Sequence, residues 1–335
     1  MLQIPLAHEP GRYANERKDD MNSRQLAKRW PFPRHKLFEK ELRNAATRWF
    51  QDRGYPTHSR MSYCLRHWND WKNNIILPEI SEYIEKTKNE CEQKGKPFPL
   101  HKYLHHGLSS QAMAFNLIGP LITRNDYEPL IQVIQENGIE NGKHIDSAVF
   151  EYEDRSVFNE DSGQPTSIDT VLTDSKRTPV FFIESKLVEK EFGGCSVFSE
   201  GDCNGENPIS NKEQCFLHFI GRKYWELMDK YGFSEILREE KQCVFVAYYQ
   251  FFREVLFALE KGGVFILLSD ERSPVFYCEV NGIEKGLMAF LLKFVPSHHA
   301  NRIASISIQK LVQKIKESKK HNDWIGEFES KYDLA

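Results

Sequence analysis

The sequence contains no long hydrophobic run and no sign of a targeting segment. A membrane-spanning helix needs roughly 18 or more apolar residues in a row, and no stretch of this chain approaches that length. The first twenty residues end in Glu16-Arg17-Lys18-Asp19-Asp20 and lack the apolar middle of a signal peptide. We therefore expect a cytoplasmic protein that has no membrane partner.

Internal repeats and two common enzyme motifs are also missing. No repeat of about 20 to 50 residues and no low-complexity tract is visible, which excludes solenoids, propellers and coiled coils. The sequence has no H-E-x-x-H metalloprotease motif and no G-x-x-x-x-G-K-S/T phosphate-binding loop. ATP-driven action by this chain alone is therefore not supported.

Cysteine is present, but not in the pattern of a disulfide framework. The seven cysteines are an odd number scattered over a long chain, so we expect reduced thiols. One cluster leaves a second interpretation open, a structural zinc site made by Cys195, Cys203, Cys215 and His218. The gaps between these four residues are irregular for such a site, so ordinary thiols are the favoured interpretation.

The composition is that of a folded protein with an uneven charge distribution. The 335 residues are 40% hydrophobic and 13% aromatic, enough to bury a sizeable core. The net charge of -3 hides a basic region and an acidic one. Residues 1–72 hold 15 Lys and Arg against 8 Asp and Glu, whereas residues 126–206 hold 6 against 18. A basic region favours a polyanionic partner, and a buried acidic region needs cations.

The order of elements along the chain predicts an α/β protein. Residues 1 to about 35 carry several prolines and are expected to form an extended arm, and residues 38–52 and 62–94 have helical periodicity. The break at 95–99 divides a basic helical N-terminal region, residues 1–100, from a core at 101–335. The core elements that we expect are a helix capped by Ser109 or Ser110, strands at 148–153, 167–173, 179–188, 263–269 and 276–280, and helices at 212–230, 245–261, 282–294 and 308–319. This order describes a mixed β-sheet flanked by helices.

Two of these strands place charged side chains opposite each other. Residues 174–178 form a turn, and a turn centred between Lys176 and Arg177 puts Asp169 directly across a hairpin from Glu184. Opposed residues have Cβ atoms about 4.5–5.5 Å apart, so two carboxylates would lie within reach of one divalent cation. Lys186 projects to the same face as Glu184, and the backbone carbonyl of Ser185 lies between them.

The apolar residues around Glu184 argue that these charges are buried. Residues 180–183 precede Glu184 and residues 187–188 follow Lys186, and all six are hydrophobic. Two facing carboxylates in such a strand would be costly without a counter-charge, and bound Mg²⁺ accepts this kind of oxygen ligand. The alternative is that Glu184 and Lys186 lie in solvent at a strand end and pair with neighbours.

The residues quoted above resemble the signature of the PD-(D/E)XK nuclease superfamily, whose fold is restriction-endonuclease-like. Asp169 followed by Glu184-Ser185-Lys186 on the next strand carries the main likeness. Three further motifs are similar to a restriction-endonuclease-like branch: the first helix from Ser109 to Leu117, the strand Phe150-Glu151-Tyr152 and the helix motif Tyr249-Gln250-Phe251-Phe252-Arg253. Two departures are Thr166-Ser167-Ile168 where proline is expected before Asp169, and Ser185 where an apolar residue is commoner. Neither removes a metal ligand.

The resemblance implies a mechanism and a set of site residues. Asp169, Glu184 and the Ser185 carbonyl would hold Mg²⁺, with Mn²⁺ able to substitute, and Lys186 would orient or deprotonate the attacking water. The supporting residues implied by the other motifs are Glu151, Gln111, Gln250 and Arg253. Each of these four also has a purely structural interpretation. Glu151 would be a surface carboxylate, and Gln111 would form a local hydrogen bond at the helix start. Gln250 and Arg253 would only link helix and sheet.

Substrate recognition is predicted from the basic region. Ten of the eleven basic residues from Arg24 to Arg66 (all but Lys40), Arg48 and Arg53 among them, are interleaved with Trp30, Trp49, Trp68 and Trp71. They would form a surface that follows phosphates, or else a helical cap whose tryptophans fill a core. A second basic cluster near the C-terminus is more simply a solvated helix face.

The activity expected from the resemblance is Mg²⁺-dependent endonucleolytic cleavage of DNA in restriction or antiphage defence. The residue chemistry itself supports phosphodiester cleavage and does not choose DNA over RNA. Two alternatives stay open: an RNA-cleaving or exonucleolytic enzyme on the same core, and a non-catalytic nucleic-acid-binding protein. A homodimer and a partner protein encoded nearby are further expectations, because one such centre cuts one strand.

Overall fold

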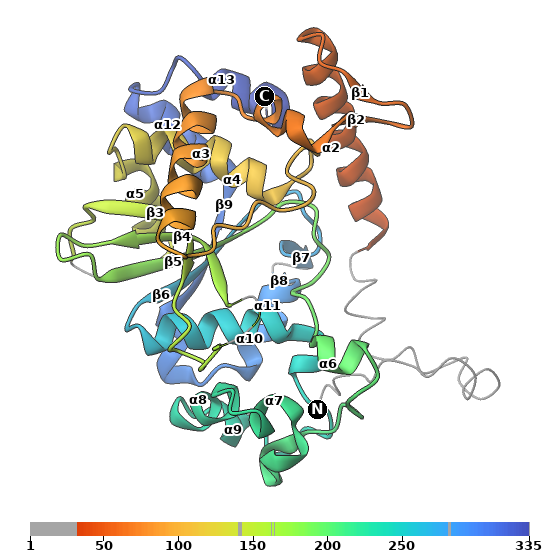
Figure 1. Ribbon diagram of the computed structural model, residues 1–335, viewed down its shortest axis with the longest axis vertical. Coiled ribbons are helices and arrows are strands. Elements are labelled where there is room, and N and C mark those ends of the chain that lie inside the picture. The colour runs from red at the N-terminus through yellow and green to blue at the C-terminus, as the bar shows by residue number, and fades with distance from the viewer. Residues whose placement is uncertain (1–31, 140–142, 162, 164, 281–282, 335) are drawn as a thin grey trace.

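A five-stranded mixed sheet lies at the centre of the molecule (Figure 1). The computed structural model describes residues 32–139, 143–161, 163, 165–280 and 283–334. The strand order is β3-β4-β5-β6-β9. The strands are β3 (Ser147–Glu153), β4 (Ser167–Thr173), β5 (Pro179–Lys186), β6 (Val264–Ser269) and β9 (Ile303–Ser307). The first three are antiparallel neighbours, and β5, β6 and β9 run parallel.

The central strands form where the sequence is uniformly apolar. All six residues of β6 are buried, and every residue of β5 after Pro179 is buried. Parallel strands covered on both faces are expected to be continuous hydrophobic runs of this kind. The predictions for β3, β4, β5 and β6 are confirmed to within one or two residues, whereas β9 was not predicted.

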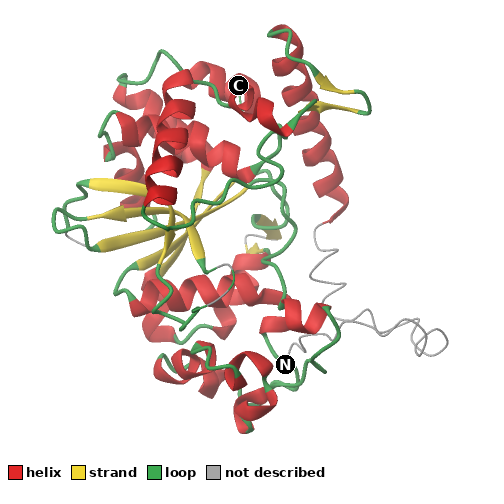
Figure 2. Ribbon diagram, viewed as in Figure 1, coloured by secondary structure: helices red, strands yellow, loops and turns green. Residues whose placement is uncertain are grey.

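Helices cover both faces of the sheet, as Figure 2 shows. The helices on one face pack into a core that includes Phe38, Ile80 and Phe115; they are α2 (Phe32–Asp52), α3 (Pro78–Gln93), α4 (Ser110–Thr123), α5 (Glu128–Glu136), α12 (Ile308–Ser318) and α13 (Ile325–Tyr332). Those on the other face share a second core with Phe182; they are α8 (Tyr224–Lys230), α10 (Phe245–Glu260) and α11 (Leu287–Leu291). The predicted α/β architecture, a mixed sheet flanked by helices with a helical N-terminal region, is therefore confirmed.

The helix that opens the core begins where its capping signal lies. The Ser109 side chain accepts a hydrogen bond from the backbone N–H of Ala112 and so satisfies one of the free donors of the first turn. Gly119 lets this helix approach α3 closely, because a Cβ there would lie 2.7 Å from Ile80. The position of α4 over the sheet is thus fixed by a cap and a close contact.

Three of the predicted helices are wrong in part. Residues 61–65 form a strand, β2, because Leu65 and Tyr63 hydrogen-bond to the backbone of residues 105–107. The segment 212–230 is interrupted at Gly221, which has a positive φ of 84°. Within the segment 282–294, residues 283–285 form a strand, and the helix begins only after Gly286. The smaller elements are β1 (Thr57–His58), β2 (Met61–Leu65), η1 (Trp68–Asn74), α6 (Ser196–Ser199), η2 (Pro208–Ser210), η3 (Lys212–Gln214), α7 (Phe216–Phe219), α9 (Phe233–Ile236), β7 (Cys278–Val280), β8 (Ile283–Lys285), η4 (Leu292–Phe294) and η5 (Ser297–Arg302).

The N-terminal region has a longer helix than predicted. The expected arm lies mostly in residues 1–31, which are outside the described residues, and residues 32–35 already belong to α2. Phe38 and Ile80 pack in the same core as the sheet residue Phe181. This shared core spans the boundary that we predicted near residue 100, and the division of the chain there stays a prediction. None of the helices in the described ranges has the length and apolar character that crossing a membrane requires.

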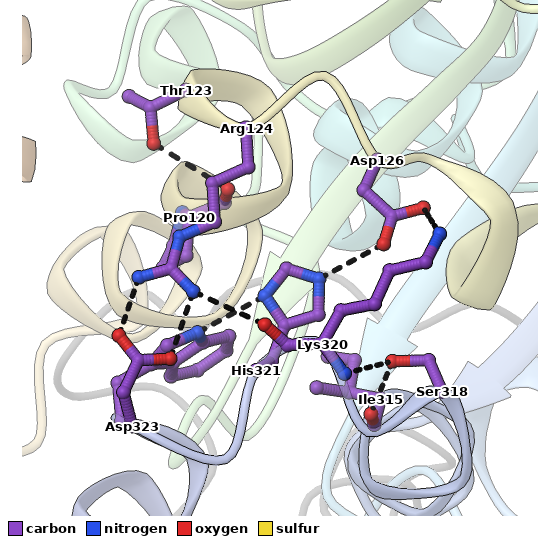
Figure 3. Close-up of polar contacts among 10 residues, drawn as sticks. Pro120, Thr123, Arg124, Asp126, Ile315, Ser318, Lys320, His321 and Asp323 are labelled. Atoms are coloured by element: carbon purple, nitrogen blue, oxygen red, sulfur yellow. Dashed lines mark hydrogen bonds and ion pairs between the residues drawn. The ribbon is translucent and has the colours of Figure 1, made fainter.

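A polar network fastens the loop before α13 to the turn that follows α4 (Figure 3). Arg124 forms two hydrogen bonds with Asp323, at 2.8 and 2.6 Å, and Asp126 lies 3.1 Å from Nε2 of His321. Trp324 donates its indole N–H to Nδ1 of His321 at 3.2 Å. Because an indole nitrogen can only donate, the His321 proton sits on Nε2 and is donated to Asp126. The C-terminal helix α13 is held by this network.

Lys331 on α13 is buried between this helix and α2, and this burial predicts how stability depends on pH. Its amino group donates to the backbone oxygen of Asn74 and lies 4.3 Å from the Trp49 ring centroid. Burial, reinforced by the charge of Arg53, holds the pKa of Lys331 well below its usual range. In the pH window below the ordinary lysine value of about 10.4, the unfolded chain therefore binds a proton that the folded chain does not. Stability is lost as pH falls through that window.

We expect Lys331→Met to raise the free energy of unfolding at pH 8 and to lose most of this advantage by pH 10. The difference between variant and wild type should shrink by at most about 1.4 kcal/mol per pH unit. Urea unfolding at several pH values measures it. Lys310→Met, at an exposed position on α12, is the matched control and should show no such trend. A constant difference across the pH range would contradict the assignment of a neutral Lys331.

Candidate active site

The hairpin of β4 and β5 brings Asp169 and Glu184 opposite each other. The observed pairs are Thr170 with Ile183 and Val171 with Phe182, and the same register continued by one residue pairs Asp169 with Glu184. Oδ2 of Asp169 accepts a hydrogen bond of 2.9 Å from the backbone N–H of Ser185. The predicted register is therefore found, although the pairing slips by one residue nearer the turn, between Leu172 and Thr173.

A buried network surrounds Glu184 on the face of the sheet that α10 covers. The Lys186 ammonium donates to Oε1 of Glu184 at 2.8 Å and to Oε1 of Gln250 at 2.9 Å. The Gln250 amide donates in turn to Glu184 at 2.7 Å and to Glu254 at 2.8 Å. Glu184 and Lys186 are 3% and 6% exposed, and Glu254 is fully buried. The alternative of a solvated strand end for Glu184 and Lys186 is therefore wrong.

A backbone irregularity in β3 directs Glu151 toward the same centre. Glu151 has a φ of +53°, the left-handed region that non-glycine residues rarely occupy. The strand changes face there, because Phe150 packs against Phe115 on one side and Tyr152 against Phe182 on the other. In a regular strand, residues two apart would share one face. Strain of this kind is concentrated at functional sites.

Glu151 is held in place by two donors. Its carboxylate accepts 2.6 Å and 2.8 Å hydrogen bonds from the Gln111 amide and the Ser167 hydroxyl, one on each oxygen. The Gln111 amide also donates to the backbone oxygen of Pro99, and its own oxygen accepts from the backbone N–H of His101. Gln111 on α4 therefore links the segment before the helix to the carboxylate centre.

The electrostatics of the centre are set by burial and by repulsion among its carboxyl groups. Burial raises the pKa of Asp169 well above its usual range, and the charges of Glu184 and Glu151 raise it further. Burial also raises the pKa of Glu151 to about 7, against the lowering effect of its hydrogen bonds from Gln111 and Ser167. Burial alone would lower the pKa of Lys186, but Glu184 and the other nearby carboxylates raise it overall. One ammonium cannot balance several carboxyl groups, so their full ionisation at this centre would need a further positive charge.

The donor set fits a hard divalent cation. Glu184 uses only Oε1 and Asp169 only Oδ2 in hydrogen bonds with the described residues, so each keeps one oxygen for another partner. Mg²⁺ is typically bound by one or two carboxylates together with water and phosphate oxygens. In the part of the chain that the structure describes, no group of three or more His, Cys, Asp or Glu side chains has an arrangement able to hold a metal ion. A metal at this centre would therefore rest on the two carboxylates, with Ser185 as a predicted third ligand.

A comparison with family models decides the class of protein. The model described as "Restriction Endonuclease associating with ARP" matches residues 43–333. The chain belongs to this restriction endonuclease family. Comparisons with curated proteins and with solved structures find no match. The family makes the protein a nuclease of restriction or defence systems, which agrees with the resemblance seen in the sequence, while the site residues, metal and substrate remain predictions.

Within this restriction endonuclease, the predicted nucleic-acid-binding residues lie in three places. Gln250 belongs to the carboxylate centre itself. The guanidinium of Arg253, one turn further along α10, lies 4.9 Å from the Tyr249 ring, and its Nε is buried without a hydrogen-bond partner among the described residues. Arg53 forms an ion pair of 2.9 Å with Glu327 on α13, and Arg48 forms one of 3.0 Å with Asp333, which directly follows α13. These pairs neutralise much of their charge, so phosphate binding by Arg48 and Arg53 stays a prediction.

The tryptophans of the N-terminal region divide between core and surface. Trp49 and Trp71 are 3% and 5% exposed and pack in hydrophobic clusters, so the core interpretation is right for both. Trp68 is 38% exposed. Trp30 lies outside the described residues.

The zinc interpretation of Cys195, Cys203, Cys215 and His218 is not supported. These four belong to the described residues, where no metal-holding group of this kind is found. Burial raises the pKa of the Cys195 thiol, which opposes the thiolate that zinc requires. The Cys215 sulfur instead accepts a hydrogen bond from the Trp225 indole.

Sequence reasoning missed Glu254, Ser167 and His101 at this site. Glu254 is the clearest omission, because it lies one helical turn after Gln250 and is fully buried, although it is an acidic residue next to Arg253 in a largely apolar helix. A charge in an apolar helix face is a signal that was available. Ser167 and His101 carried no such signal, since both roles depend on long-range packing around Gln111 and Glu151.

Proposed function

We propose that the protein is a Mg²⁺-dependent DNA endonuclease whose active centre, of the PD-(D/E)XK type, consists of Asp169, Glu184 and Lys186. The observation that carries this proposal is the register of β4 and β5, which places Asp169 opposite the buried Glu184 and its ammonium partner Lys186, in a member of a restriction endonuclease family. Mg²⁺ bound there would polarise the scissile phosphate and lower the pKa of a coordinated water.

The chain's own residues have separate tasks in this proposal. Asp169 and Glu184 would hold the metal, and Lys186 would orient the water and offset negative charge on the phosphate. Gln250 fixes both Lys186 and Glu184 through its amide, so we assign it as a positioning residue. Burial raises the pKa of Glu254 well above its usual range, and its Oε1 accepts a hydrogen bond from the Gln250 amide.

The proposed partners follow from the family and from the chemistry. DNA is the substrate expected of a restriction endonuclease, and the family description speaks of association with ARP. We propose that this chain likewise works with that partner. Cleavage of both strands would need two such centres, which favours a homodimer on DNA.

Metal removal gives the direct test. The purified protein is incubated with supercoiled plasmid, linear duplex and structured RNA in parallel, with Mg²⁺ or with excess EDTA. We expect nicking or linearisation of the plasmid with Mg²⁺, substitution by Mn²⁺, and no cleavage with EDTA. Electrophoresis of the products measures it.

The same experiment separates the alternatives. Degradation of linear duplex from its ends alone would indicate an exonuclease, and cleavage of RNA alone would indicate a ribonuclease. Equal cleavage in excess EDTA would contradict the metal assignment. Retention of DNA without any cleavage, in the presence of the ARP partner as well, would favour a binding protein.

A further inference from the structure

Half-exposed aromatic side chains lie together on the surface formed by η1 and the segment before α4. Trp68 is 38% exposed and Tyr103 is 52% exposed. The Trp68 indole donates to the backbone oxygen of His101 at 3.3 Å, and the His101 and Tyr103 rings have centroids 5.2 Å apart. Lys102 is also exposed, with its ammonium 5.0 Å from the Tyr103 ring. We call Trp68, His101, Lys102 and Tyr103 the aromatic platform.

The backbone beneath the platform is held by hydrogen bonds from Asn74 and Leu65. Asn74, which is fully buried, donates to the backbone oxygens of Leu104 at 2.8 Å and His106 at 2.9 Å. Leu65 at the end of β2 donates to the oxygen of His105. Trp68 and Tyr103 stay half exposed on this supported backbone and so forgo the free energy of apolar burial. Such exposure indicates a binding surface.

The platform is joined to the carboxylate centre by one side chain. The backbone N–H of His101 donates to Gln111 at 2.8 Å, and the amide of the same Gln111 donates to Glu151 at 2.6 Å. Burial lowers the pKa of His101. The charge of Glu189 raises this pKa, and the charges of Lys102 and Lys186 lower it further. His101 therefore lies within electrostatic reach of Lys186 itself.

The charge of the platform's surroundings suits a polyanion. Arg66 and His67 are exposed immediately before Trp68, and Lys102 is exposed beside Tyr103. Aromatic rings interleaved with cations are the features by which proteins bind single-stranded nucleic acid, since each base offers a face for stacking and each phosphate a charge. In a closed duplex these base faces are covered by neighbouring base pairs.

We propose that Trp68 and Tyr103 stack on unpaired bases of the DNA strand whose phosphate enters the Asp169–Glu184 centre, with Lys102 and Arg66 on the adjoining backbone. This inference rests on the proposed function for the position of the scissile phosphate. It defines the preferred substrate as DNA with unpaired or displaced bases beside the cut, rather than a fully paired duplex.

Binding is tested with the Asp169→Asn protein, so that DNA is not cut during the measurement. The probes are a single-stranded oligonucleotide, a duplex with an internal unpaired bubble and a fully paired duplex, each followed by fluorescence anisotropy. We expect Trp68→Ala with Tyr103→Ala to weaken binding of the first two probes about 5- to 100-fold and to leave the paired duplex unchanged. Trp68→Phe with Tyr103→Phe should retain most of the affinity, because stacking needs only the ring.

Phe219→Ala is the matched control, since Phe219 is 72% exposed on α7 and α7 lies at the end of the molecule opposite β2 (Figure 1). It should bind all three probes as the parent does. Unchanged binding in the double alanine variant, or an equal loss for all three probes, would overturn the platform. If the wild type cuts DNA and the double alanine variant cuts the bubble equally fast, the platform is wrong and the proposed function stands. If no DNA is cut but the difference between probes holds, the platform stands and the nuclease centre is wrong.

Discussion

Asp169→Asn is expected to abolish DNA cleavage and, at the same time, to stabilise the metal-free protein. A metal contributes several kcal/mol of transition-state stabilisation, so loss of one of its two carboxylate ligands should lower the cleavage rate by about 1,000-fold or more. Asn keeps the size of Asp and can still accept the hydrogen bond from the N–H of Ser185. The fold should therefore be unaffected.

The gain in stability has an electrostatic cause. Burial and the charges of Glu184 and Glu151 raise the pKa of Asp169 well above its usual range. The unfolded chain releases this proton near the ordinary aspartate pKa, so at neutral pH the folded state is penalised for holding the carboxyl group. Asn has no such group, and the melting temperature of the metal-free variant should exceed that of the wild type by a few degrees.

Two measurements on the same samples check this prediction. Plasmid cleavage with Mg²⁺ gives the rate, and thermal unfolding with and without Mg²⁺ gives the stability. Mg²⁺ should raise the melting temperature of the wild type and have little effect on Asp169→Asn. Asp202→Asn removes an exposed carboxylate and should behave as the wild type does. An Asp169→Asn protein that still cut DNA at a tenth of the wild-type rate would contradict the ligand assignment.

The pair Asp169 and Glu184 could be predicted because its geometry is local. Residues 174–178 make a short turn between two strands, and a hairpin with a known turn centre has only one register. The apolar residues on either side of Glu184 then indicate burial. The pairing found between Thr170 and Ile183 agrees with the predicted register, although it also depends on the one-residue slip between Leu172 and Thr173, which the sequence did not indicate.

Other parts of the site could not be predicted because they depend on contacts distant in sequence. The left-handed backbone at Glu151 has no signature in a Phe-Glu-Tyr stretch, and it decides where this carboxylate points. Glu254 meets Gln250 within α10, but its nearness to Lys186 depends on how that helix packs on the sheet. The unpredicted strand β9 pairs with β6, which lies at least 34 residues earlier in the chain, and small residues such as Ala304 and Ser305 carry little strand signal.

Lys186→Met is expected to reduce both cleavage and stability, in contrast to Asp169→Asn. The variant keeps the apolar stem of the side chain and removes the only ammonium that donates to Glu184 in the described part of the chain. Loss of a cation that stabilises developing negative charge typically lowers a rate about 100- to 1,000-fold. Removal of one member of a buried ion pair costs about 3–5 kcal/mol of stability, since the remaining carboxylate stays buried without its partner.

The control and the metal dependence distinguish this role of Lys186 from a purely structural one. Lys190→Met, four residues further on and exposed, should leave cleavage and stability unchanged. If Glu184 is a metal ligand, saturating Mg²⁺ should restore much of the stability of Lys186→Met, because the metal supplies the missing positive charge, yet cleavage should stay low. A structural role alone would restore cleavage together with stability. Recovery of the wild-type rate in Mg²⁺-saturated Lys186→Met would therefore remove Lys186 from the mechanism and leave the two carboxylates as the whole centre.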